Sequence, residues 1–249
     1  MSILVSGASD IGRKRKTNQD SIYAPNSGNY FVVADGMGGH NGGDIASQMT
    51  TKIFPQYISE NIQAYSPDEL LKKTIKFINR SIYDHGQSNE DLKGMGTTIT
   101  SVFFTEETTY IANIGDSRTY LIHNNSLFQL TRDHSLVQEK LNLGIYDRKG
   151  AKADPQKNVL TKTVGFEKDV DADVYKFKNQ NFDIYLLCSD GLHGKVCDEE
   201  ILKIVQYCVP NPQEATQEQF DLAVENLIRQ ANLNGGQDNI SVVLAMQTY

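Results

Sequence analysis

Cysteine is scarce in this chain of 249 residues, with only Cys188, Cys197 and Cys208 present. An odd and sparse set of cysteines is typical of free thiols in a reducing compartment and not of a disulfide-stapled secreted domain. None of the three begins a Cys-x5-Arg motif or a Cys-x-x-Cys pair, so neither a thiol nucleophile of that kind nor a thiolate metal site is expected. Cys188 ends an apolar run and is predicted to lie in the core.

Long apolar runs and an excess of positive charge are also lacking. No run approaches the roughly 18 apolar residues that span a bilayer. The N-terminal stretch MSILVSGASDIG is too short and too polar for a signal peptide. The formal net charge of −7 argues against nucleic acid as the main partner. We therefore expect a cytoplasmic protein with no membrane insertion and no nucleic-acid partner.

Several common catalytic motifs are missing. No two histidines have the short helical spacing of a zinc motif. Asn41 stands where GMGGHN would need the last glycine of GxGxxG. The stretch GASDIGRK carries Arg13 and Lys14 where a P-loop needs lysine followed by serine or threonine. Nor is there a GxSxG nucleophile elbow, so the usual nucleotide-binding and serine-hydrolase motifs are excluded.

The hydrophobic pattern predicts an α+β domain. There is no internal repeat or proline-rich linker, so residues 1–249 are expected to form a single domain. Helical patterns cover 66–86, which begins with a capping signal, and 213–234, which Gly235-Gly236 should end. A weaker pattern covers 44–63, where Pro55 should kink or divide the helix. Apolar runs predict strands at residues 30–34, 97–104, 108–114, 118–123, 183–188 and 240–246, and this order favours antiparallel sheets.

Four of the predicted strands have an aspartate at one end: Asp35, Asp116, Asp190 and Asp238. Buried strands pack side by side, so these ends can meet in space. Four gathered carboxylates would repel each other strongly unless a cation lay among them. The alternative is four independent turns or caps, because aspartate is common in both.

A glycine-rich segment, VVADGMGGHNGG at residues 32–43, supports the cation site. Five glycines follow Asp35 within eight positions, which is more than a turn needs. Aspartates and backbone carbonyls are oxygen ligands that suit Mg²⁺ or Mn²⁺, and Mg²⁺ keeps several of its waters. The Gly36 carbonyl is a candidate ligand, and a loop with few side chains leaves room for those waters.

Eight stretches together resemble one family, the metal-dependent protein phosphatases of type 2C in their compact bacterial form. They occur in the family's order over nearly the whole chain: RKTNQDS, VVADGMGGHNGG, GMGTT, IANIGDSR, LTRDHSLVQ, NVLTKTVG, LLCSDGL and GGQDNISVVL. The resemblance implies a four-layer αββα sandwich, in which two antiparallel sheets face each other and helices lie outside. It also implies a metal site in a cleft at one rim.

The resemblance assigns ligands to two ions, Mn²⁺ or Mg²⁺, and to a third in bacterial members. By matching positions, Asp35 should bridge the two ions and the carbonyl of Gly36 should bind the second. Asp190 and Asp238 should bind the first ion. Asp116 and Asp190 match the positions that hold the third, looser ion.

The resemblance also implies roles around the reacting phosphate. Arg15 should bind the phosphate, and Asp20 should act through metal-bound water. His40 is a candidate to protonate the leaving oxygen; the alternatives are a structural role for it and a proton supplied by metal-bound water. Two positions depart from the family: Gln19 replaces a common glutamate, and Asp154 replaces a histidine near the cleft. The second change is expected to alter substrate choice or proton delivery.

Three further segments carry weaker predictions. The run RKRK at 13–16 is expected to attract phosphorylated proteins, with a solvated basic surface as the alternative. Residues 139–157 are expected to form a mobile, flap-like insertion beside the cleft, or else a plain surface loop. Thr97 and Thr98 are predicted to be sheet residues and not nucleophiles, and His134 is predicted to be structural.

The function implied is a phosphoprotein phosphatase that hydrolyses phosphoserine and phosphothreonine with a metal-activated water and no phosphoenzyme. We expect it to be a monomer whose partners are phosphorylated proteins and an opposing bacterial serine/threonine kinase. One alternative is a non-catalytic phosphoprotein-binding pseudophosphatase, which the retention of Asp35, Asp190 and Asp238 disfavours. The other is a metal-dependent phosphodiesterase or nuclease, which the acidic balance disfavours.

Overall fold

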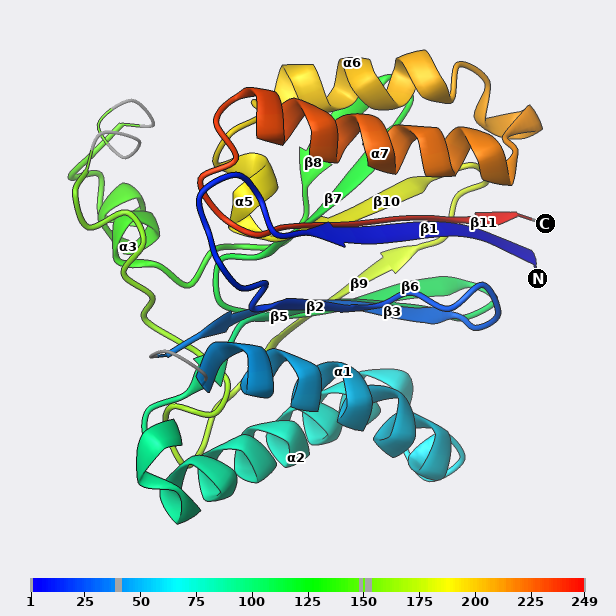
Figure 1. Cartoon of the computed structure of the whole chain (residues 1–249). Coiled ribbons are helices and arrows are strands. Elements are labelled where there is room, and N and C mark those ends of the chain that lie inside the picture. Colours follow the sequence, from blue (N-terminus) through cyan, green and yellow to red (C-terminus); the bar gives the residue numbers. More distant parts are fainter. Residues whose placement is uncertain (1, 39–41, 148–149, 151–153, 249) are drawn as a thin grey trace.

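The computed structural model describes residues 2–38, 42–147, 150 and 154–248. Two antiparallel sheets face each other, and both termini of the described chain lie at the same end of the sandwich (Figure 1). The five-stranded sheet has the order β1 (Ser2–Asp10), β11 (Ile240–Thr248), β10 (Ile184–Cys188), β7 (Arg118–His123) and β8 (Ser126–Gln129). The six-stranded sheet has the order β2 (Asp20–Tyr23), β3 (Tyr30–Met37), β5 (Ile99–Phe104), β6 (Thr108–Ile114) and β9 (Asp173–Lys178), with β4 (Gly96–Thr97) paired to β3.

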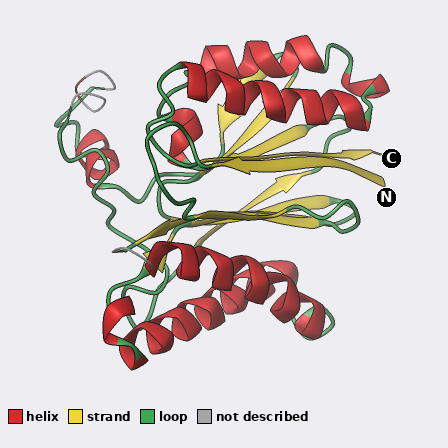
Figure 2. Ribbon diagram, in the orientation of Figure 1, coloured by secondary structure: helices red, strands yellow, loops and turns green. Residues whose placement is uncertain are grey.

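Helices cover the outer face of each sheet, as the colouring in Figure 2 makes plain. The six-stranded sheet is covered by α1 (Gly42–Asn61) and α2 (Pro67–Ser88), and the five-stranded sheet by α6 (Asp198–Cys208) and α7 (Gln217–Leu233). The short α5 (Asp190–His193) lies at one end of the sandwich, and α3 (Leu136–Asn142) stands outside the layers. Short 3₁₀ turns occupy Glu90–Leu92 and Pro212–Glu214. The predicted four-layer αββα architecture is therefore confirmed.

The central strands are apolar on both faces because both faces are covered. On β3, Phe31 and Val33 point between the sheets, whereas Val32 points toward α1 and α2. On β11, Val243 faces the other sheet and Val242 faces α6 and α7. Alternate residues thus enter different cores, and a strand buried on both faces reads as a continuous apolar run.

The four strands that the sequence did not predict are β1, β2, β8 and β9, and these are the edge strands of the two sheets. Their side chains are mostly exposed or half-buried, so their sequences lack a continuous apolar run. Helix α6 was also not predicted, although it buries Ile201, Val205 and Cys208 at helical spacing. The amphipathic pattern of α6 is therefore visible in the sequence. The edge strands leave only a weak hydrophobic pattern, because many of their side chains face solvent.

The three helices that the sequence predicts are present as α1, α2 and α7. Helix α1 runs through Pro55 without a break, so this proline does not divide the helix, and the alternative expectation of a kink stays a prediction. Phe54 and Ile58 beside it are fully buried, and this packing holds both turns in place despite the missing N–H. At the start of α2, the Glu69 carboxylate accepts hydrogen bonds from the N–H and the hydroxyl of Ser66, as the capping signal predicts. No described helix is long and apolar enough to cross a membrane.

Candidate active site

The predicted aspartates come together at one end of the sandwich. Asp35 lies near the end of β3, and Asp116 follows β6. Asp190 begins α5 just after β10, and Asp238 lies two residues before β11, the antiparallel neighbour of β10. In Figure 1 these strand ends of both sheets lie at the same end of the sandwich, opposite the two chain termini. Asp20, at the start of β2, stands directly opposite Asp35.

The pKa values of these carboxyl groups show that they interact. Burial and then repulsion by Asp116, Asp238 and Asp20 raise the pKa of Asp190 to about 8. Burial, followed by repulsion from Asp20 and Asp190, raises the pKa of Asp35 well above its ordinary value. Burial is also the largest cause that raises the pKa of Asp20 to about 6, and likewise that of Asp116. The chain therefore gathers carboxyl groups in a buried site, where burial and mutual repulsion make their ionised form unfavourable.

The residues present fit hard divalent cations. All five groups offer oxygen atoms, the donors that Mg²⁺ and Mn²⁺ prefer. The Oδ1 atom of Asp20 is buried and has no hydrogen-bond partner among the described residues. In the described part of the chain, no three acidic, imidazole or thiol groups close around a single point. Mg²⁺ keeps several of its waters and takes only one or two carboxylates, so it needs no tight cage of protein ligands.

Arg15 reaches into this acidic site from the loop between β1 and β2. Its Nη2 atom donates to Oδ2 of Asp238 at 2.7 Å, while half of the Arg15 side chain stays exposed. The hydrogen bond to Asp238 and attraction by Asp190 and Asp35 raise the pKa of Arg15, although burial opposes the shift. A cationic fork therefore lies beside the carboxylates with most of its donors still available.

The backbone around Asp35 is fixed by residues of the GMGTT motif. The hydroxyl of Thr97 and the N–H of Thr98 donate to the Asp35 carbonyl at 2.9 and 2.8 Å. The Asp35 N–H donates to Oγ1 of Thr98, which also bonds the hydroxyl of Ser117 next to Asp116. Both threonines are buried and join two aspartate-bearing segments, but only Thr97 belongs to a strand, because Thr98 lies between β4 and β5.

Glycine is required at position 36 by close packing. A Cβ atom there would lie 1.9 Å from the carbonyl oxygen of Gly43 and 2.5 Å from that of Gln19. The Gly36 N–H donates to the same Gln19 carbonyl. The glycines at 36 and 43 therefore let the start of α1 pack directly on β3 beside Asp35, which is a structural reason for part of the glycine-rich segment.

Three supporting residues were not predicted from the sequence. Ser189 donates to Oδ2 of Asp20 at 2.7 Å. His193 Nε2 donates to the carbonyl oxygen of Asp116 at 3.0 Å, which ties that segment to α5. The buried amide of Asn239 bonds three backbone groups of the loop that carries Arg15. Ser189 and Asn239 adjoin predicted ligands in the sequence, and that adjacency was the available signal.

Two histidines were also singled out in the sequence, His134 as a structural residue and His40 as a candidate proton donor. His134 is buried, and its Nδ1 accepts from the N–H of Gly115, in keeping with a structural role. His40 lies outside the described residues.

The Asp154 carboxylate is buried and accepts a hydrogen bond from Lys140 Nζ of α3 at 2.8 Å, which lowers the pKa of Asp154. An ionised Asp154 cannot replace a histidine as a proton donor, so its part in this site is an ion pair within the 139–157 segment.

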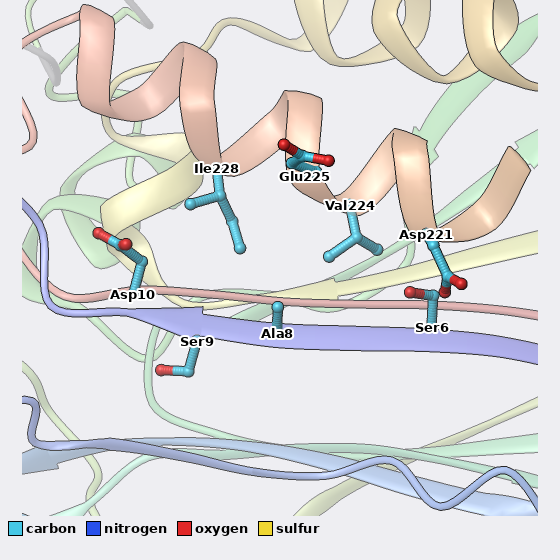
Figure 3. A pocket seen from close by; sticks show the side chains of 8 residues that line it. All are labelled: Ser6, Ala8, Ser9, Asp10, Asp221, Val224, Glu225 and Ile228. Carbon is cyan, nitrogen blue, oxygen red and sulfur yellow. The ribbon is translucent and has the colours of Figure 1, made fainter. Parts of the chain in front are cut away.

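A separate hollow lies on the outer side of the five-stranded sheet, between β1 and α7 (Figure 3). It measures about 310 Å³, and Ala8 of β1 faces Val224 and Ile228 of α7 across it. Asp10 at its rim already accepts hydrogen bonds from the Gly12 N–H and the Asn232 side chain. We assign this hollow no function.

Known proteins resemble this chain over almost its full length. The sequence model of the family Protein phosphatase 2C matches residues 7–227. The serine/threonine phosphatase stp of Listeria monocytogenes is 37% identical over 241 residues, which cover 94% of this chain and 92% of that protein. The structure of the serine/threonine phosphatase PstP/Ppp of Mycobacterium tuberculosis matches with a TM-score of 0.89, at 30% identity and 100% coverage of both chains. The PstP catalytic domain in complex with two manganese ions matches with a TM-score of 0.85, at 30% identity and 99% coverage of each chain. The chain therefore belongs to the protein phosphatase 2C family of serine/threonine phosphatases.

Proposed function

We propose that this protein hydrolyses phosphoserine and phosphothreonine in protein substrates, using Mn²⁺ or Mg²⁺, as a monomer that opposes a serine/threonine kinase. The observation that carries the proposal is the gathering of five carboxylates at one end of the sandwich, with the Arg15 guanidinium beside them. Mutual repulsion on this scale is relieved by divalent cations. The manganese-bound relative supports the same choice of ion.

The ligand set follows from the residues that converge. Asp35, Asp190 and Asp238 would hold two ions together with the Gly36 carbonyl, and Asp116 with Asp190 would hold a third, looser ion. When bound, the ions supply an activated water as nucleophile and neutralise charge on the phosphoryl oxygens. The protein's own residues then bind, orient and transfer protons around the substrate.

Arg15 would clamp the substrate phosphate. Its planar fork matches two phosphate oxygens, and one of its donors is already fixed by Asp238. This hydrogen bond orients the guanidinium, so the phosphate would be placed next to the carboxylates.

Asp20 would orient water beside the nucleophile. Its buried Oδ1 has no hydrogen-bond partner among the described residues and can accept a hydrogen bond from water. Burial raises the pKa of Asp20 to about 6 in the metal-free chain, and bound cations would lower that pKa and keep the carboxylate ionised. Asp154 is held ionised by Lys140 and would not donate a proton. His40 stays the candidate for protonating the leaving seryl or threonyl oxygen.

Phosphate release tests the proposal. The substrates are one phosphoserine and one phosphothreonine peptide, with bis-p-nitrophenyl phosphate as a diester control and with Mn²⁺, Mg²⁺ or EDTA added. We expect peptide turnover that requires a divalent ion and is lost in EDTA. Turnover that survives EDTA would contradict the metal mechanism. Activity confined to the diester would indicate a phosphodiesterase, and peptide binding without turnover in Mn²⁺ would indicate a binding module.

A further inference from the structure

The loop that joins β1 to β2 carries a concentration of positive charge on an acidic protein. The formal net charge of the chain is −7, yet residues 13–16 read Arg-Lys-Arg-Lys and all four are exposed. Arg15 is paired with Asp238. Within the described ranges, Arg13, Lys14 and Lys16 form no ion pair. Their charges are therefore available to an anionic partner from outside the chain.

This loop is held rigidly against the segment that carries Asp238. The buried Asn239 side chain donates to the carbonyls of Ile11 and Thr17, both at 3.0 Å. Its Oδ1 accepts from the N–H of Gln19 at 2.9 Å. One amide thus closes both ends of the loop, and it lies next to Asp238 in the sequence. The loop is positioned by buried hydrogen bonds and does not depend on surface contacts.

Two more contacts fix the middle of the loop. The N–H of Arg13 donates to the carbonyl of Gly236 at 2.7 Å. Gly12 has a φ of +80°, and a Cβ atom there would lie 2.2 Å from the carbonyl oxygen of Asp238. On the same segment, Lys195 Nζ donates to Oε1 of Gln237. The Arg13 backbone and the Lys195 side chain therefore contact residues 236 and 237, directly beside Asp238, a proposed metal ligand.

We propose that Arg13, Lys14, Lys16 and Lys195 form a basic rim that selects phosphoproteins with acidic side chains next to the phosphorylated residue. This inference rests on the proposed phosphatase function. Arg15 takes the reacting phosphate, so Lys14 and Lys16 on either side of it meet the residues that flank the phosphoserine or phosphothreonine. Opposite charge there speeds encounter and favours one class of substrate over another.

The balance of charge favours a protein partner over nucleic acid. The cations form one short rim around a site of five carboxylates, and the protein as a whole is acidic. A nucleic acid would meet repulsion over most of the surface, whereas a short acidic segment would contact only the rim.

The test compares three phosphoserine peptides that differ only in their flanking residues, which are glutamate, alanine or lysine. Each kcat/KM is divided by that for p-nitrophenyl phosphate, which has no flanking residues. The rim variant is Lys14→Ala/Lys16→Ala. The matched control is Lys72→Ala/Lys203→Ala, which removes the same charge from exposed positions on α2 and α6.

We expect the wild type to prefer glutamate flanks over alanine flanks by about 3- to 10-fold, and alanine over lysine, because each exposed ion pair contributes modestly. The preference should shrink between about 50 and about 500 mM NaCl, as screening predicts. It should disappear in the rim variant and persist in the control.

Equal rates for the three peptides in the wild type, or an unchanged preference in the rim variant, would overturn the rim alone. Turnover of p-nitrophenyl phosphate with no turnover of any peptide would overturn the proposed function and the rim with it. The wild type could instead bind a DNA oligonucleotide, lose that binding in the rim variant and show no preference among the peptides. That result would assign the loop to nucleic acid and also overturn the rim.

Discussion

Asp20 stands directly opposite Asp35 in the antiparallel pair of β2 and β3. Like charges at facing positions destabilise a sheet, and here the pair also lies in a poorly solvated site. After burial itself, Asp20 is the largest cause of the raised pKa of Asp35. The fold thus keeps a destabilising arrangement at the place where the family's reaction needs cations, and the predictions below test this relationship.

The stability of the metal-free protein should fall as pH rises from about 6.5 to about 8.5. Asp35 and Asp190 have raised pKa values in the folded state, about 8 for Asp190, whereas their unfolded values lie near 3.8. The folded protein then binds more protons than the unfolded chain, so its stability is lost as the pH rises through the folded pKa. The lowered pKa values of His134 and His193 act in the opposite direction, but only below their ordinary value of 6.5.

Thermal melts in EDTA check this prediction. The melting temperature should drop by several degrees across that window, and excess Mn²⁺ should remove most of the drop, because bound cations neutralise the carboxylates. A metal-free melting temperature that is flat or rises with pH would contradict the electrostatic account.

Asp190→Asn should separate activity from stability. Removing one carboxylate should lower kcat/KM for a phosphopeptide at least about 100-fold, since a group at the reacting centre is lost. The same change should stabilise the metal-free protein at pH 8, because it relieves the repulsion of Asp116 and Asp238. Asp221→Asn on α7 is the control for charge and should change neither quantity. A variant that is inactive and also less stable in EDTA would count against the proposed role.

Arg15→Ala should raise KM for a phosphopeptide by about 10- to 100-fold, the range expected for loss of a charge-assisted hydrogen bond. Metal affinity should not weaken, because the change removes a cation from beside Asp238. Arg15→Lys should recover part of the loss, since lysine keeps the charge without the planar fork. Steady-state kinetics and Mn²⁺ titration measure the two effects, and an unchanged KM would remove Arg15 from the phosphate role.

His193→Phe should destabilise the metal-free protein by about 1–3 kcal/mol, the cost of leaving a buried carbonyl without its donor. The lost hydrogen bond joins His193 Nε2 to the Asp116 carbonyl. Urea denaturation in EDTA measures the effect without interference from ions. His193→Gln, which keeps a donor, should lose less, and His85→Phe at the exposed end of α2 should be close to neutral. Equal stability of all three variants would show that the bond has no positioning role.

Asp154→Ala should make the segment after α3 more sensitive to limited proteolysis. Its carboxylate is buried against Lys140, and loss of the pair frees the end of that segment from α3. Because Lys140 lowers the pKa of Asp154, the protection should hold at neutral pH and be lost only in acid, below the ordinary carboxyl pKa. Asp171→Ala removes an exposed ion pair with Lys76 and is the matched control. Equal cleavage rates for both variants would refute the role of the Lys140–Asp154 pair.

The amino-acid sequence by itself determined the central strands, the capped helices and the residues that carry the acidic site. Strands such as β3 and β11 are buried on both faces, so their apolar runs are unambiguous, and their terminal aspartates were visible at once. Eight ordered motifs then identified the family. The edge strands were not determined in this way, because half-exposed strands leave only a weak pattern.

Only the tertiary structure decided how distant residues combine. The register of β2 on β3 places Asp20 against Asp35, and the amide of Asn239 closes a loop more than 200 positions earlier in the chain. The tertiary structure also brings the Asp154 carboxylate to Lys140 and the His193 ring to the Asp116 carbonyl. Such pairings depend on where separate elements pack, and local propensity carries no information about a partner that folding alone brings into contact.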